Sequence, residues 1–287
     1  MFDLALSILC SSCIFVIFKL YSTYKIQTFY AIITNYFIAC FCGFLFYKGD
    51  VSFIELPQRN WFWGTFALGV FFIIVFNLMA ATAQRVGVSV ASVATKMSLV
   101  IPVLFGVVLY DEKLEPLNIL GIVLALVAVY FASIKESKIR VQKTALFLPI
   151  LVFLGSGIID TTIKYMQEVF FNEAEFPLFS AVVFGAAALT GTGFILVKSI
   201  KGDLKINWLN VMGGIALGVP NYFSIFFLMR ALQNDTWNSA AIFTINNVAI
   251  VMFSTLLGIL LFKEKISPRN WGGIALAVVS ILLVAKY

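Results

Sequence analysis

Three charged side chains lie inside long apolar segments of this 287-residue chain, where an isolated charge is costly. Lys96 stands between Thr95 and Met97, and Lys164 follows Asp160 by one helical turn. Asp160 can therefore pair with Lys164 on its own helix face. Alternatively, Asp160 faces a cavity, pairs there with Lys96, and exchanges that partner for a proton or a bound solute. In a third arrangement, the alkyl chain of either lysine lies along the apolar surface and its ammonium group reaches water.

Neutral polar side chains occur in the same kind of apolar segment. An amide both donates and accepts hydrogen bonds, which suits a polar small molecule, but it can equally join two helices at about 0.6 to 2 kcal/mol. As a set on several segments, these residues predict a cavity. The candidates for substrate binding are Asn77, Lys96, Asn221, Tyr222, Asn246 and Asn247, and those for proton coupling are Asp160 and Lys164.

The chain lacks the residues that several other functions require. The chain has no histidine, which excludes Ser/His/Asp triads and HExxH zinc sites. Its four cysteines fall within residues 10–42, where a thiol is usually a small apolar group, so no metal and no cofactor is expected. There is no GxxxxGK[ST] motif for a nucleotide and no basic aromatic pattern for nucleic acid.

Composition and segment length define the elements that must position these residues. The chain is 61% hydrophobic and 12% charged, more apolar surface than a soluble core can bury. The apolar runs have the length at which a helix crosses ~30 Å of hydrocarbon, and they lack the alternation of barrel strands. Ten transmembrane helices are predicted, at residues 3–20, 28–47, 61–83, 88–110, 115–134, 145–167, 177–198, 207–232, 237–262 and 269–286.

An internal repeat organises these helices. Residues 112–127 (EKLEPLNILGIVLALV) return 152 positions later at 264–279 (EKISPRNWGGIALAVV), with nine of sixteen positions identical. Such duplication indicates that one membrane unit occurs twice.

The match extends upstream of these segments. Gly69 aligns with Gly218, and at an offset of 145 Ser11 aligns with Ser156. The unit is therefore five helices, and because five is odd the second copy must be inverted. The predicted fold is an all-α membrane protein of two inverted five-helix repeats, at residues 1–134 and 144–287, with a loop at 135–143.

At this level the chain resembles the EamA-type branch of the drug/metabolite transporter superfamily. The resemblance rests on SVATKMSLVIPVLFGVVLYDEK, with Pro102, followed by a helix that opens with Gly121. The second half repeats this as TINNVAIVMFSTLLGILLFKEK before Gly273, with Ser254 in the place of the proline. The resemblance implies transport of small metabolites by alternating access. It also implies that the first, third, fourth, sixth, eighth and ninth helices surround a central cavity and that the fifth and tenth lie at the periphery.

Together these features predict a secondary transporter for a small metabolite, an amino acid or a similar polar or amphipathic solute, coupled to a proton or another gradient. A membrane-embedded enzyme, or a sensor or structural membrane protein, is the alternative. The expected location is the plasma (cytoplasmic or inner) membrane. The expected partners are a small-molecule substrate and the lipid bilayer, with no nucleic acid, in a monomer or in a homodimer through the peripheral helices.

Overall fold

The computed structural model describes residues 2–49, 54–98, 101–102, 105, 116–133, 147–171, 173–200, 207–232, 237, 239–263 and 268–285. All regular secondary structure within these residues is helical, which confirms the predicted all-α class for them. The α-helices are α1 (Phe2–Thr23), α2 (Thr28–Phe46), α3 (Phe62–Arg85), α4 (Val88–Met97), α6 (Pro116–Ser133), α7 (Phe147–Phe170), α8 (Phe176–Ile200), α9 (Trp208–Leu232), α10 (Ser239–Phe262) and α11 (Pro268–Ala285). Two short 3-10 helices, η1 (Leu56–Gln58) and η3 (Glu173–Glu175), precede α3 and α8.

Each α-helix overlaps one of the predicted segments. Seven of those in the described residues are long and apolar enough to cross a membrane: α1, α2, α3, α7, α8, α9 and α10. Helix α4 has ten described residues, because most of the remainder of the predicted segment 88–110 lies outside them. The repeated Glu-Lys turns at residues 112–113 and 264–265 and the predicted loop at 135–143 also lie outside. The chain is an integral membrane protein.

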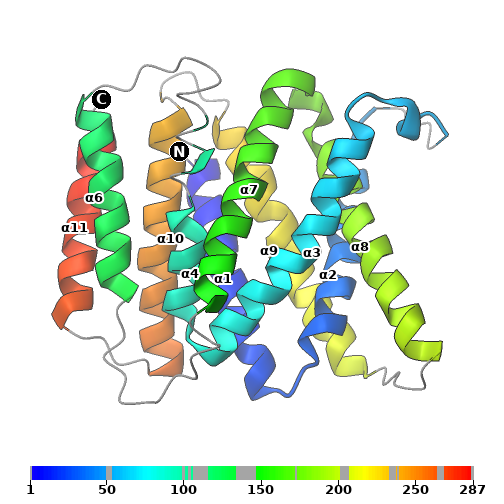
Figure 1. The fold of residues 1–287 in the computed structure, drawn as a ribbon, viewed down its shortest axis with the longest axis horizontal. Coiled ribbons are helices and arrows are strands. Elements are labelled where there is room, and N and C mark those ends of the chain that lie inside the picture. Colours follow the sequence, from blue (N-terminus) through cyan, green and yellow to red (C-terminus); the bar gives the residue numbers. More distant parts are fainter. Residues whose placement is uncertain are drawn as a thin grey trace.

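The two halves of the chain pack mainly against each other. In Figure 1, α6 and α11 lie together at one edge of the bundle and α8 lies at the other edge. Helix α2 packs on α8 and α9, α1 on α9 and α10, and α3 on α7 and α8. Helix α4 packs on α7 and α10, and α6 packs on α11. Each of these contacts joins a helix from the first 134 residues to one that follows residue 143.

Aromatic side chains fill the junction between α1, α2, α3 and α8. Tyr36 of α2 is fully buried and stacks on Phe184 of α8, with ring centroids 6.0 Å apart. Phe76 of α3 contacts Phe18 of α1 edge to face at 5.7 Å, and Phe72 contacts Phe184 in the same way at 5.9 Å. Such pairs contribute about 0.5 to 1.5 kcal/mol each beyond their buried area. They give the central cavity a rigid wall, since Phe72 and Phe76 also line it.

Two glycines allow close approach of helices from opposite halves. At Gly69 of α3 an added Cβ would collide with the carbonyl oxygen of Val183 and with Ala186 of α8. At Gly218 of α9 it would meet the carbonyl oxygen of Asn35 at 2.8 Å and Ile38 Cβ of α2 at 2.7 Å. Any larger side chain would push these helix pairs apart.

Candidate functional site

A cavity of about 120 Å³ lies where six helices meet. Helices α1, α3 and α4 come from the first half of the chain, and α7, α9 and α10 come from the second. These are the six helices that the resemblance places around a central cavity, and α2, α6, α8 and α11 do not line it. The lining residues are Ser11, Ile14, Phe15, Phe72, Val75, Phe76, Met79, Thr95, Lys96, Ser156, Ile159, Asp160, Ile163, Asn221, Ser224, Ile225, Leu228, Met229, Leu232, Phe243 and Asn246.

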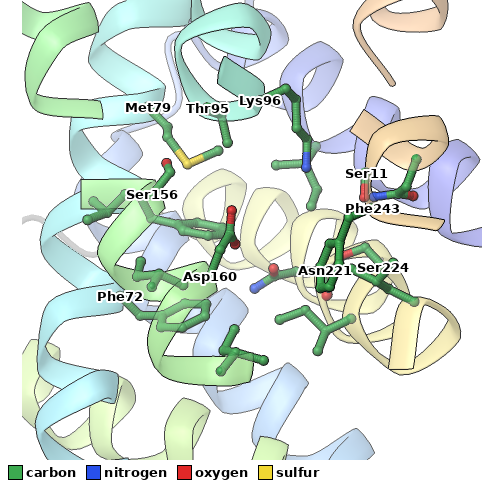
Figure 2. A pocket seen from close by; sticks show the side chains of 18 of the residues that line it. Ser11, Phe72, Met79, Thr95, Lys96, Ser156, Asp160, Asn221, Ser224 and Phe243 are labelled. Carbon is green, nitrogen blue, oxygen red and sulfur yellow. The ribbon is translucent and has the colours of Figure 1, made fainter. Parts of the chain in front are cut away.

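Two opposite charges face this cavity from different halves. Lys96 comes from α4 and Asp160 from α7, two helices that pack directly against each other. Figure 2 shows the two side chains extending toward the same space, where their charges attract each other. Asp160 Oδ2 accepts a hydrogen bond from Ser98 Oγ at 3.3 Å. No direct ion pair joins Lys96 to Asp160 among the described residues, so the two charges act across the cavity.

Two buried asparagines line the cavity. Asn221 Nδ2 donates to Asn35 Oδ1 of α2 at 3.1 Å. Asn246 Oδ1 lies 3.3 Å from Ser7 Oγ of α1, which donates at the shorter distance of 2.9 Å to Ser224 O of α9. Each asparagine therefore lies against a polar side chain from the other half of the chain.

Two serines that line the cavity were not among the predicted site residues. Ser156 of α7 is 4% exposed, and its hydroxyl has no hydrogen-bond partner among the described residues. Ser11 of α1 lines the opposite part of the same cavity. The repeat alignment matched these two serines, and that match was the signal that could have found them.

Four predicted site residues lie elsewhere. Asn77 of α3 faces a separate apolar groove, and its Nδ2 donates to Ile73 O of its own helix at 2.7 Å. Tyr222 is fully buried beside the cavity, stacked on Phe46 with centroids 5.9 Å apart. Asn247 is buried away from the lining. Lys164 Nζ lies 4.0 Å from Glu168 Oε1, one turn further along α7. The structure thus brings Lys96, Asp160, Asn221 and Asn246 together and leaves these four outside.

The cavity lies at the middle of α1, α3 and α7 and extends along α9 and α10 toward one end of the bundle. Helix α1 begins and α11 ends at this end, which we call the terminal end (Figure 1). The cavity lining on α9 runs from Asn221 to the last residue of the helix, Leu232, and α10 contributes Phe243 and Asn246 from its first turns. At the opposite end, Gln27 N donates to Asn210 Oδ1 at 2.8 Å, and Asn210 Nδ2 donates to Gln27 Oε1 at 2.9 Å. Tyr21 Oη also donates to Gly213 O at 2.8 Å, so three hydrogen bonds join the halves at that end.

The fold and the cavity define the class: a helical membrane protein with a mostly apolar pocket at the junction of its two halves, into which two opposite charges face. The N-terminal half, residues 2–134, matches the EamA-like transporter family. The resemblance predicted from the repeated segments is confirmed, and the chain fits the drug/metabolite transporter superfamily.

Individual proteins are also similar to this chain. An uncharacterized protein of Haemophilus influenzae is 29% identical over 98% of this chain and 96% of its own length. The uncharacterized transporter YwfM of Bacillus subtilis is 24% identical over 80% of this chain and 76% of its own length. A protein of known crystal structure has a similar fold, with a TM-score of 0.69 at 16% identity over 99% of this chain and 96% of that chain. The family match and the transporter name of the Bacillus subtilis relative support a membrane transporter of the drug/metabolite kind, and they suggest that the chain is not an enzyme.

Proposed function

We propose that this protein is a secondary transporter that binds a small polar or amphipathic metabolite between two inverted five-helix halves and exposes it alternately to each side of the membrane. The observation that carries the proposal is the central cavity, to which each half contributes three helices and one of the two facing charges. Transporters built from inverted repeats bind their substrates at such an interface.

The packing pattern supports an inverted repeat of ten helices. When each helix of residues 1–134 is exchanged with its counterpart in residues 144–287, the contact of α1 with α9 becomes that of α7 with α3, and both are extensive. The contact of α2 with α9 likewise becomes that of α8 with α3. Gly69 and Gly218 each lie against a carbonyl oxygen and a side chain three residues later on the partner helix. A pseudo-twofold axis in the membrane plane would produce each of these correspondences.

The two ends of the bundle support alternating access. Hydrogen bonds join the halves at the end opposite the termini, and the cavity extends along α9 and α10 toward the terminal end. Rocking of one half against the other would break these bonds and expose the cavity to the other side of the membrane.

Asp160 is the group that we assign to proton coupling. Its carboxylate faces the cavity, with Lys96 and Ser98 as the charged and polar groups facing it from the α4 side and apolar side chains facing it from α3. A proton on Asp160 would remove its attraction to Lys96 and to a cationic part of the substrate. Proton binding and substrate binding are thereby linked.

Transport by purified protein in proteoliposomes tests the proposal. We expect counterflow of a bound solute, and we expect the Asp160→Asn variant to lose the pH dependence of transport while it remains folded, because an amide does not titrate. The matched control is Glu168→Gln, the same chemical change two turns away on α7 and 41% exposed, which should keep the pH dependence. Lys164→Gln separates the two pairing arrangements, since loss of coupling in that variant would favour the local Asp160 to Lys164 pair.

The coupling assignment is wrong if Asp160→Asn transports with an unchanged pH profile. Absence of counterflow for every solute that binds the purified protein would contradict transport itself. Turnover of a bound solute without translocation would favour the enzyme alternative.

A further inference from the structure

We propose that one anionic phospholipid binds at the start of α11, with an acyl chain in each of two grooves beside this helix and its phosphate at Arg269. The site lies on the outer surface of the bundle, away from the central cavity, and its ligand comes from the membrane. The inference goes beyond the proposed transport function and is tested separately from it.

Two apolar grooves flank α11. One, of about 500 Å³, lies between α6 and α11, and the other, of about 480 Å³, lies between α1, α10 and α11. The first is lined by Phe131, Arg269, Gly272, Ala275, Leu276 and Val279. The second is lined by one face of α10, from Ala249 to Ile259, together with Ile8 of α1 and Trp271 of α11. These helices lie together at one edge of the bundle (Figure 1).

Both grooves have the depth of one membrane leaflet. The lining on α11 extends from Arg269 to Val279 and that on α10 from Ala249 to Ile259, ten residues in each case, or about 15 Å of helix. The hydrocarbon core of a bilayer is ~30 Å thick, so this length is half of it. Helix α10 ends and α11 begins at the end opposite the termini, so both grooves start there. A diacyl lipid of that leaflet supplies one chain for each groove.

Two polar side chains lie where the headgroup of this lipid would be. Arg269 is exposed and forms no ion pair with another described residue. A guanidinium group binds phosphate oxygens through two parallel hydrogen bonds. Trp271 is 60% exposed, and at the membrane interface an indole keeps its ring in the apolar layer and its N–H near polar groups. A lipid phosphate therefore fits between the two grooves.

Positive charge is concentrated at the same end of the sequence connections. The segments that follow α1, α6, α8 and α10 contain nine lysines and arginines, Lys25, Lys135, Lys138, Arg140, Lys143, Lys201, Lys205, Lys263 and Lys265. Those that follow α2, α4, α7 and α9 contain three, Lys48, Arg59 and Lys113. Such an excess marks the cytoplasmic side, where the leaflet carries anionic lipids. The headgroup is therefore expected to carry a net negative charge.

The position of Arg269 favours a lipid over a second copy of the chain. In a twofold dimer whose axis lies along the membrane normal, both copies have the same orientation and present the same surface. A contact through these grooves would bring Arg269 of each copy to the same end of the interface, where the like charges repel. A lipid phosphate has the opposite charge and attracts Arg269.

Two glycines make a matched pair of probes. At Gly272 an added Cβ would meet nothing within 4 Å, so a large side chain can enter the groove beside α6 without displacing a helix. Gly193 of α8 is also exposed with nothing within 4 Å of an added Cβ, and it lines neither groove. Phenylalanine at each position makes the same chemical change, but only Gly272→Phe fills the proposed chain site.

Native mass spectrometry of the detergent-purified protein measures lipid binding directly. The probes are dioleoylphosphatidylglycerol, dioleoylphosphatidylcholine with the same chains, and oleoyl-lysophosphatidylglycerol with a single chain. We expect one molecule of the anionic diacyl lipid to bind about fivefold more tightly than the zwitterionic one. The single-chain lipid should bind more weakly than the diacyl lipid of the same headgroup, because one groove stays empty.

Two variants separate the headgroup from the chains. Arg269→Gln should remove the preference for phosphatidylglycerol over phosphatidylcholine. Its matched control is Arg85→Gln, at an exposed arginine that ends α3, which should keep the preference. Gly272→Phe should lose the tightly bound molecule of either diacyl lipid, and Gly193→Phe should retain it.

Melting temperature and size-exclusion profile establish that each variant is folded, and if one variant fails to fold the other still tests its own part of the site. The proposal is overturned if the two diacyl lipids bind equally, if Arg269→Gln keeps the preference, or if Gly272→Phe binds lipid as the wild type does. A loss of dimers in Gly272→Phe with unchanged lipid binding would assign the face to a second copy instead. Each of these results leaves counterflow, and with it the transport function, to be decided separately.

Discussion

The two ends of the helix bundle join the halves of this protein by different chemistry. At the end opposite the termini, Asn210 is 2% exposed and exchanges two hydrogen bonds with Gln27, and Tyr21 adds a third to the backbone of α9. At the terminal end, Asp3 of α1 and Arg230 of α9 form an ion pair at 3.8 Å whose side chains are 28% and 53% exposed. Exposed ion pairs contribute about 0 to 1 kcal/mol, whereas loss of one partner from a buried hydrogen bond costs about 1 to 3 kcal/mol.

The terminal end also has an apolar contact between the halves. Leu4 of α1, Ala231 of α9 and Ile242 of α10 belong to a buried cluster there. At the opposite end Asn210 is buried and its partner Gln27 is exposed. Salt should weaken the ion pair at the terminal end and leave the neutral hydrogen bonds at the opposite end unchanged.

The largest expected effect comes from locking the terminal end. With the four native cysteines replaced, Asp3→Cys and Arg230→Cys can be joined by a short bismaleimide. Because each end must open once per cycle, we expect the cross-link to abolish transport, measured as counterflow in proteoliposomes. A monofunctional maleimide on the same variant is the control. Transport that persists after complete cross-linking would contradict alternating opening at this end.

The next effect comes from loosening the opposite end. Asn210→Ala removes two hydrogen bonds and leaves Gln27 without its partners, so the free energy of unfolding should fall by about 1 to 3 kcal/mol. The population open at that end should rise, which would lower maleimide labelling of a Ser11→Cys cavity probe from the terminal side. Asn77→Ala, whose hydrogen bond stays within its own helix, is the matched control. Unchanged labelling and stability would show that Asn210 does not seal this end.

A smaller effect is expected from Tyr21→Phe. It removes the single hydrogen bond to Gly213 O and keeps the ring in place, so the loss of stability should be about 0.5 to 1.5 kcal/mol. Thermal unfolding measures this change. Tyr24→Phe makes the same chemical change at an exposed tyrosine directly after α1, and it should leave the melting temperature unchanged. Equal effects of the two substitutions would argue against a role for the Tyr21 bond.

The smallest effect is expected from Asp3→Asn. The ion pair is exposed, so its loss should change stability by less than about 1 kcal/mol at low ionic strength and by less at high salt. Thermal unfolding at two salt concentrations provides the measurement. A loss as large as that of Asn210→Ala would reverse the comparison between the two ends.

Helix segments and the choice of cavity helices could be anticipated before the structure. Long apolar runs indicate membrane helices, because lipid offers no hydrogen bonds and a helix satisfies its backbone N–H and C=O groups internally. The resemblance implied which six helices surround the cavity, and the scarcity of charge in these segments pointed to Lys96 and Asp160. Both residues line the cavity.

The sequence did not show which individual asparagines face the cavity. Asn77 and Asn221 occupy matched helices, yet Asn221 faces the cavity and Asn77 bonds to its own helix backbone beside an outer groove. Hydrophobic periodicity would normally reveal the buried face of a helix. In a membrane it does not, because the lipid-facing and protein-facing sides are both apolar.

Sequence alone thus determined that this chain is a helical membrane protein, that one unit occurs in it twice, and that few charges lie within its apolar segments. These properties follow from composition, segment length and self-similarity, which do not depend on how helices rotate about their axes. Only the tertiary structure decided which polar side chains share a cavity and which of them pair with the other half of the chain. Those outcomes depend on contacts between residues far apart in the sequence, since Asn35, Ser7 and Gln27 occupy hydrogen-bonding groups on the other half of the chain.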